Sequence, residues 1–199
     1  GAMLERSRVI AVTAQCRAEI QEIYTHQIID QVALLAPVVT WGGKLDARTP
    51  ASSLSAALKA LTLGRPGPVH LDVPGDLWNL KLGQLDRYVE PQPIAPAPEI
   101  LASAASAVRA ARRPVIAVGL GDLSDDSAQA LRQFSLSTQI PVMTTYRAKG
   151  MVDETGPWSL GAFGLSPVVD ERHQALLAEA DLLIAVGLDP VELRPHWLP

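Results

Sequence analysis

Apolar residues along this chain occur either in short continuous runs or at helical spacing. The runs predict buried strands at residues 9–13, 38–41, 69–73, 114–119, 141–145 and 182–186. Apolar residues at helical spacing predict helices at 28–35, 51–63, 98–113, 168–179 and in a segment that begins after Ser124. Strands and helices therefore alternate, which predicts an α/β fold with parallel strands joined by right-handed crossovers.

A proline-rich segment divides this pattern. Residues 89–99 read Val-Glu-Pro-Gln-Pro-Ile-Ala-Pro-Ala-Pro-Glu, and these prolines exclude both a helix interior and a central strand. We therefore predict a domain at 1–82, a linker at 83–98 and a second domain at 99–199. In the second domain, Ser124 is expected to cap a helix that buries Ala128, Leu131 and Phe134. The helix from Pro98 is expected to bury one face, formed by Ile100, Leu101, Ala104, Ala105 and Val108.

Composition and charge narrow the possible partners. Hydrophobic residues make up 48% of the chain and aromatic residues only 5%, a balance typical of buried parallel sheets covered by helices. A net charge of -4 without a basic run argues against nucleic acid and acidic membranes as partners. Cys16, the single cysteine, suits a reducing cytoplasm. No secretory signal or membrane-spanning apolar run is present, so we expect a cytoplasmic protein without a membrane partner.

Several motifs resemble those of one enzyme family, both in their residues and in their order along the chain. The segment 64–77 contains GRPGPV, a strand and DVPGD, and resembles the end of the pyrimidine-binding domain in thiamine diphosphate-dependent enzymes of the acetolactate synthase type. Upstream, Thr13-Ala14-Gln15, the run from His26 to Asp30 and the run from Ala36 to Thr40 are similar to further motifs of that domain. Downstream, residues 144–150, 159–164 and 182–187 resemble the family's central domain.

The resemblance implies both a fold and an activity. It implies two Rossmann-like parallel-sheet domains: residues 1–82 are the C-terminal part of an incomplete pyrimidine-binding domain, and 99–199 are a C-terminally incomplete central domain. The full-length protein would be a lyase or transferase with thiamine diphosphate and Mg²⁺, acting on a small 2-oxo acid as a decarboxylase or carboligase. It would form a homo-oligomer, a dimer or tetramer. The family's catalytic glutamate would precede Gly1 and its metal-diphosphate site would follow Pro199, so we expect no catalytic or metal-ligating residue here and an inactive fragment.

Three residues are candidates for the vicinity of substrate and cofactor. Gln15 follows a strand end, where α/β proteins place ligand groups, although a plain loop amide is an equal alternative. By resemblance, His26 and Gln27 stand where the family has Phe-Gln beside the substrate channel. The alternative is an ordinary solvated helix in which Glu22, His26 and Asp30 follow one another at a spacing of four.

A glycine turn is the second candidate site. Gly119-Leu120-Gly121 imitates a dinucleotide-binding turn, but the third glycine is missing and Asp122, Asp125 and Asp126 would repel a diphosphate. Some members of the family hold FAD or ADP in the central domain. The matching positions for such a nucleotide are Gly119, Gly121, Thr144, Thr145, Lys149, Gly187 and Asp189. For Lys149, which could meet a phosphate, the alternative is a simple cap of the turn before Gly150.

Two other interpretations remain open. One is a non-catalytic Rossmann-like module that binds a nucleotide or mediates assembly. The other is a nicotinamide nucleotide-binding domain of the transhydrogenase or sirtuin-like kind, against which the weak glycine turn argues.

Overall fold

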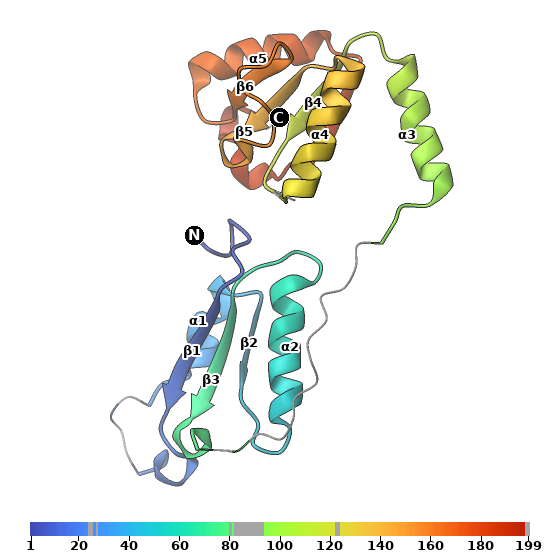
Figure 1. The fold of residues 1–199 in the computed structure, drawn as a ribbon. Coiled ribbons are helices and arrows are strands. Elements are labelled where there is room, and N and C mark those ends of the chain that lie inside the picture. Colours follow the sequence, from blue (N-terminus) through green and yellow to red (C-terminus); the bar gives the residue numbers. More distant parts are fainter. Residues whose placement is uncertain (24–25, 27, 80, 82–93, 122–123, 198–199) are drawn as a thin grey trace. The chain divides into compact units, whose positions relative to one another are not determined.

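The chain divides into two compact units, Gly1–Ile94 and Ala95–Pro199 (Figure 1). The computed structural model describes residues 1–23, 26, 28–79, 81, 94–121 and 124–197. Most of the predicted linker, 83–98, lies outside these residues. Each unit is an α/β structure with a parallel sheet, which confirms the predicted fold class.

The first unit has a parallel sheet in the order β1-β3-β2 among its described residues. Its strands are β1 (Ile10–Gln15), β2 (Trp41–Lys44) and β3 (Val69–Pro74), and its helices are α1 (Gln31–Leu35) and α2 (Pro50–Thr62). Ala57 and Leu61 of α2 pack on Val69 of β3, on one face of the sheet. His70, which points to the opposite face, lies towards α1 because both His70 and Val32 approach Gly42. The two helices therefore cover opposite faces.

The second strand was predicted wrongly. The sequence pattern places it at 38–41, but residues 36–38 form a 3₁₀ turn with Pro37 inside it. Pairing with the neighbouring segment begins at Thr40, whose backbone N–H donates to the Pro68 carbonyl at 2.8 Å. The apolar pattern therefore placed the strand too early, over the 3₁₀ turn that precedes it. Similarly, the helix expected from residue 28 begins at Gln31, because the Asp30 side chain accepts from the Ala33 N–H at 2.9 Å and caps it.

The second unit has a parallel sheet in the order β6-β5-β4-β7 among its described residues. The strands are β4 (Pro114–Val118), β5 (Val142–Thr145), β6 (Ser159–Phe163) and β7 (Leu182–Val186). The helices are α3 (Pro98–Ala110), α4 (Asp125–Thr138) and α5 (Pro167–Glu179). Strand β6 was not predicted, because glycine interrupts its apolar pattern at Gly161 and its register with β5 shifts there.

Alternation along the strands divides the core of this unit into two layers. Ile116, Val118 and Val142 pack with Ala128 and Leu131 of α4. Val115, Ala117 and Met143 form the other layer with Phe163, Leu176 and Leu177, which brings in α5. The strands are thus buried on both faces, as expected for a parallel sheet between helices.

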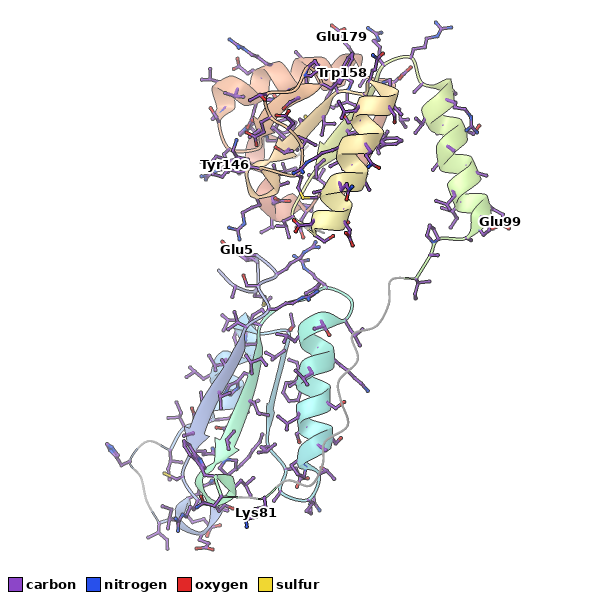
Figure 2. All side chains as sticks on the ribbon, in the orientation of Figure 1. Glu5, Lys81, Glu99, Tyr146, Trp158 and Glu179 are labelled. Atoms are coloured by element: carbon purple, nitrogen blue, oxygen red, sulfur yellow. The ribbon has the colours of Figure 1, made fainter. Side chains whose placement is uncertain are left out.

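Several residues of α4 and α3 that were expected in the core are exposed in the structure. Ser124 does cap α4, accepting from the Ser127 N–H at 3.3 Å, but Phe134 is 38% exposed. The buried position is the next residue, Ser135, whose hydroxyl donates to the Ile140 carbonyl at 3.0 Å. On α3, which begins beside the labelled Glu99 in Figure 2, Ile100 and Leu101 are exposed and Val108 packs against the core. The apolar face predicted for α3 is therefore covered only near its C-terminal end.

A buried carboxylate joins the loop after β6 to the last described turn. Asp170 is fully buried and accepts from the Gly164 N–H at 2.8 Å. Its other oxygen accepts from His196 Nε2 and Trp197 Nε1, both at 2.9 Å. Burial alone would raise the pKa of Asp170, but hydrogen bonds from Trp197, Gly164 and His196 outweigh burial and lower this pKa below 3.8.

We expect Ile116→Ala to lower the free energy of unfolding of the second unit by about 2–5 kcal/mol, because it removes a fully buried side chain and leaves a cavity. The matched control is Ile100→Ala, at a side chain that is 62% exposed, for which we expect a change within about 0.5 kcal/mol. Urea unfolding monitored by circular dichroism measures both. Equal losses for the two variants would contradict the described core.

The lowered pKa of Asp170 predicts a pH dependence of stability. A carboxyl whose folded pKa lies below its unfolded value stabilises the fold above the unfolded pKa, and this contribution is lost as pH falls through the folded pKa. Urea midpoints should therefore fall as pH decreases below about 4. Asp170→Asn should reduce the midpoint near neutral pH and weaken this acid dependence, because the amide NH₂ would face a donor. Glu171→Gln, exposed on the same helix, is the control and should retain the wild-type slope.

Candidate functional site

The carboxyl ends of the three strands in the first unit meet at one edge of the sheet. β1 ends at Gln15, β2 at Lys44 and β3 at Pro74, and all three run parallel. Gln15 Oε1 accepts from Gln21 Nε2 at 3.3 Å, and the same amide nitrogen donates to the Cys16 carbonyl at 2.7 Å. The loop after β1 thus holds Gln15 at the edge where α/β proteins place ligand groups.

The structure describes only one of the two residues that the resemblance places beside the substrate channel. His26 is exposed in a turn, and Gln27 lies outside the described residues. Asp30 caps α1 instead of lying within a helix that contains His26. The interpretation of Glu22, His26 and Asp30 as one helical face is therefore wrong.

A cavity of about 300 Å³ opens at this same edge. Its lining includes Lys44 and Asp76, two charged residues that the sequence analysis did not single out. Asp46 and Arg48, also in the lining, form an ion pair at 3.2 Å. Hydrogen bonds from the side chain and the backbone of Arg48 hold the pKa of Asp46 below its usual value. The signal for these two residues was their position at strand ends, since Lys44 is the last residue of β2 and Asp76 lies two residues after β3, but this signal required correct strand boundaries.

Below this edge, a buried polar network joins β1 to β3. The Thr13 hydroxyl donates to Asp72 Oδ1 at 3.0 Å and therefore accepts from His70 Nε2 at 2.8 Å. His70 and Asp72 are both buried, and His70 Nδ1 has no hydrogen-bond partner among the described residues. Thr13 lies directly opposite Asp72 in the register of the sheet. The network links the strand that ends at Gln15 to the central strand.

In the second unit, the structure brings most residues of the predicted nucleotide site to the carboxyl edge of its sheet. Val118 pairs with Thr144, so the turn after β4 lies beside the end of β5. The Gly119 N–H donates to the Val186 carbonyl at 2.8 Å, and the Gly121 N–H donates to the Gly187 carbonyl at 2.9 Å. The turns after β4 and β7 therefore lie directly against each other.

The two glycines of the turn are explained by this close approach. A Cβ added at Gly121 would lie 2.5 Å from Gly187 Cα, and one added at Gly119 would lie 2.6 Å from Leu188 Cα. Neither position tolerates a side chain without movement of the neighbouring backbone. The spacing that resembles a dinucleotide turn thus serves contact between two loops.

Glu192 is a residue of this site that the sequence analysis missed. It belongs to the 3₁₀ turn Pro190–Glu192 after β7, and its Oε2 accepts from the Leu120 N–H at 3.0 Å. Its Oε1 accepts a hydrogen bond from the Thr145 hydroxyl. Asp189, nearly fully buried, begins the same turn and accepts from the Val191 N–H at 3.0 Å. No strand or helix pattern in the sequence points to Glu192, because its partners lie far away in the chain.

Two further residues of the predicted nucleotide site, Lys149 and Thr144, differ in their surroundings. Lys149 forms an ion pair with Glu154 at 2.6 Å, which supports a role in the local turn. Thr144 is buried, and its hydroxyl has no hydrogen-bond partner among the described residues.

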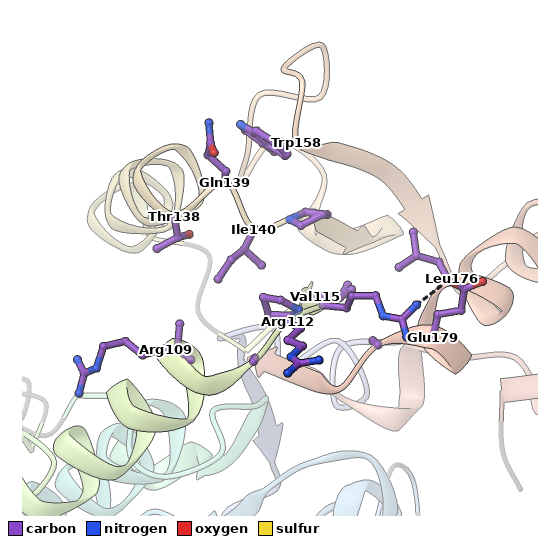
Figure 3. A pocket seen from close by; sticks show the side chains of 15 residues that line it. Arg109, Arg112, Val115, Thr138, Gln139, Ile140, Trp158, Leu176 and Glu179 are labelled. Carbon is purple, nitrogen blue, oxygen red and sulfur yellow. Dashed lines mark hydrogen bonds and ion pairs between the residues drawn. The ribbon is translucent and has the colours of Figure 1, made fainter.

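A larger cavity, of about 710 Å³, lies at the opposite, amino edge of this sheet (Figure 3). Ile140 and Val115 lie within its apolar part, and Trp158 lies across the opening from Arg112. Arg113 and Glu179, both in its lining, form an ion pair at 3.2 Å. None of the predicted site residues lines this cavity, so cavity size alone does not identify the candidate site.

The part of the chain that the structure describes contains no group of three or more His, Cys, Asp or Glu side chains arranged to hold a metal ion. In the same part, no helix has the length and apolar character needed to cross a membrane.

Comparison with known proteins gives the family. The thiamine pyrophosphate enzyme central domain matches residues 101–197, within the second unit. The probable acetolactate synthase large subunit of Methanococcus aeolicus is 28% identical over 92% of this chain and 32% of its own length. The acetolactate synthase large subunit of Parasynechococcus marenigrum is 34% identical over 70% of this chain and 24% of its own length.

A relative with a different name matches a similar share of the chain. Oxalyl-CoA decarboxylase of Escherichia coli is 31% identical over 73% of this chain and 25% of its own length. The chain therefore spans about a third or less of the curated relatives that it matches. The similarity extends through both units, and the chain belongs to the acetolactate synthase-like family of thiamine pyrophosphate-dependent enzymes.

Proposed function

We propose that this chain is part of a thiamine diphosphate-dependent enzyme that decarboxylates a small 2-oxo acid and transfers or releases the product, as an acetolactate synthase-like lyase or transferase. The observation that carries the proposal is the alignment with an acetolactate synthase large subunit over 92% of the chain, which crosses both units. We assign residues 1–82 to a pyrimidine-binding domain and 99–199 to a central domain.

The first unit would supply one wall of the reaction site. At the carboxyl edge of its sheet, the Gln15 amide is held by Gln21, and Lys44 and Asp76 line the adjacent cavity. An amide at this position both donates and accepts hydrogen bonds, so it suits the orientation of a polar ligand. The buried network of Thr13, His70 and Asp72 would keep β1 in register with β3 and thereby position Gln15.

Thiamine diphosphate, when bound, supplies a group that stabilises the carbanion left by loss of CO₂. The described residues do not fit the metal-diphosphate part of this cofactor, because they contain no group of three or more His, Cys, Asp or Glu side chains arranged to hold a metal ion. We therefore propose that protein outside these residues binds Mg²⁺ and the diphosphate, and the family resemblance leads us to place the catalytic glutamate there as well.

We also propose a homo-oligomer, a dimer or tetramer, in the cytoplasm. Strand β1 is at an edge of its described sheet and exposes Ile10 and Val12, which are 46% and 62% exposed. Exposed apolar side chains on an open edge suit coverage by further protein. Cys16, the single cysteine, suits a reducing compartment.

We expect Gln15→Ala, in the longer polypeptide that we propose contains these residues, to lower kcat/KM for its 2-oxo acid about tenfold, the effect of about 1.4 kcal/mol on the barrier. The reason is loss of a hydrogen bond between the amide and the ligand. Gln133→Ala, exposed on α4 in the second unit, is the matched control and should leave kcat/KM unchanged. Steady-state kinetics at saturating thiamine diphosphate and Mg²⁺ measure both, and equal kinetics of the two variants would count against this role.

We expect the 199-residue chain alone to release no CO₂ from pyruvate in the presence of thiamine diphosphate and Mg²⁺. The reason is that its described residues contain no group of three or more His, Cys, Asp or Glu side chains arranged to hold the Mg²⁺ that binds the cofactor's diphosphate. A coupled assay of CO₂ release, with a complete acetolactate synthase as positive control, tests this. Thiamine-dependent release above the rate without protein would refute the assignment of cofactor binding to other residues.

A further inference from the structure

We propose that the Glu192 carboxylate takes the anion-binding position of the turn at 119–121, so that the second unit does not bind FAD or ADP at this edge. The proposal concerns a nucleotide site that the fold could otherwise offer. It does not depend on the thiamine chemistry proposed above, because its residues and its measurements lie within the second unit.

The hydrogen-bond donors that a phosphate would use are already engaged. Backbone N–H groups in the turn after a strand normally bind phosphate in such sites. Here the Leu120 N–H donates to Glu192 Oε2 at 3.0 Å, and the Thr145 hydroxyl donates to Glu192 Oε1. The N–H groups of Gly119 and Gly121 donate to the carbonyls of Val186 and Gly187. Three consecutive N–H groups of the turn are thus satisfied within the chain.

Space at the turn is also taken. A Cβ at Gly119 would lie 2.6 Å from Glu192 Oε2, and one at Gly121 would lie 2.5 Å from Gly187 Cα. In a dinucleotide-binding turn, the glycines let the pyrophosphate approach the backbone. Here the Glu192 carboxylate and the turn after β7 occupy the space next to the glycines.

The charge around the turn has the wrong sign for a diphosphate. Glu192 and the nearly buried Asp189 lie on one side, and Asp125 and Asp126 occupy the first turn of α4. Lys149, the cation proposed for a phosphate, is paired with Glu154. A diphosphate entering here would be repelled by like charges in a partly desolvated place.

Glu192 is held in this position by the turn that carries it. The Glu192 N–H donates to the Asp189 carbonyl at 3.0 Å, and the Asp189 side chain accepts from the Val191 N–H at 3.0 Å. Two residues later, the Arg194 N–H donates to the Gly164 carbonyl at 3.0 Å. These hydrogen bonds hold the backbone that carries Glu192, and the Leu120 N–H and the Thr145 hydroxyl hold its carboxylate, so a phosphate would have to displace the carboxylate from both donors.

Titration of the ¹⁵N-labelled chain with ADP, and separately with FAD, tests the proposal through the amide resonances of Leu120 and Gly121. We expect these resonances to stay unchanged up to about 1 mM nucleotide. A Kd of about 1 mM corresponds to a binding free energy of only about 4 kcal/mol, so even weak binding would be detected. Saturable shifts of Leu120 and Gly121 would overturn the proposal. Shifts confined to other residues would place the nucleotide elsewhere and support it.

Two variants test the contact itself. In Glu192→Ala the Leu120 N–H loses its acceptor, so we expect its exchange with solvent to accelerate at least tenfold relative to wild type, as about 1.4 kcal/mol of lost protection implies. Glu192→Gln retains an acceptor oxygen and should keep most of the protection. If the alanine variant fails to fold, the nucleotide titrations of the wild-type chain still test the proposal. Leu120 exchange that is the same in all three proteins would overturn the proposal.

Discussion

The second unit depends on the close approach of two turns at the carboxyl edge of its sheet. Backbone atoms after β4 and β7 lie so near each other that a Cβ at Gly121 would lie 2.5 Å from Gly187 Cα. Hydrogen bonds between the turns and the Glu192 carboxylate then join the ends of β4, β5 and β7. A parallel sheet leaves its strand-end N–H groups at such an edge, and they need acceptors from a ligand, from water or from the chain. In this unit the chain supplies them.

In the first unit, the polar groups that the chain itself must satisfy lie elsewhere. Here the buried polar groups are on the face of the sheet: Thr13 connects Asp72 with His70 across two paired strands. A shared hydroxyl that accepts from one ring nitrogen and donates to a carboxylate is satisfied only when β1 and β3 are in the observed register. The network therefore selects the register, while the strand ends, with Gln15 and Lys44, stay available to other groups. This difference supports a ligand edge in the first unit and a structural edge in the second.

The sequence was sufficient for the fold class and for elements with continuous apolar runs or proper caps. β3, β5, β7, α2 and α5 lie within a residue or two of their predicted bounds, because turns and prolines flank them. Prediction failed where local chemistry competed with the apolar pattern: Pro37 continued a helical turn through Val38, and Ser135 replaced Phe134 in the core by donating to Ile140. The networks around Asp72, Asp170 and Glu192 could not be predicted at all. Their partners are brought together by strand register and loop packing, which a single sequence does not specify.

The glycine turn shows why a motif and a family together still leave a ligand undecided. From the sequence alone, Gly119 and Gly121 are explained equally well by phosphate binding and by close packing of two loops. Both need a residue without a side chain. The contacts separate the two explanations, because a phosphate and the Glu192 carboxylate compete for the same Leu120 N–H. An internal carboxylate pays no translational entropy on binding, so it competes at a high effective concentration against any free nucleotide. The Glu192 carboxylate does not act alone, because the backbone contacts of Gly119 and Gly121 and the acidic first turn of α4 also oppose a diphosphate, and together they are the physical basis for proposing a structural edge here.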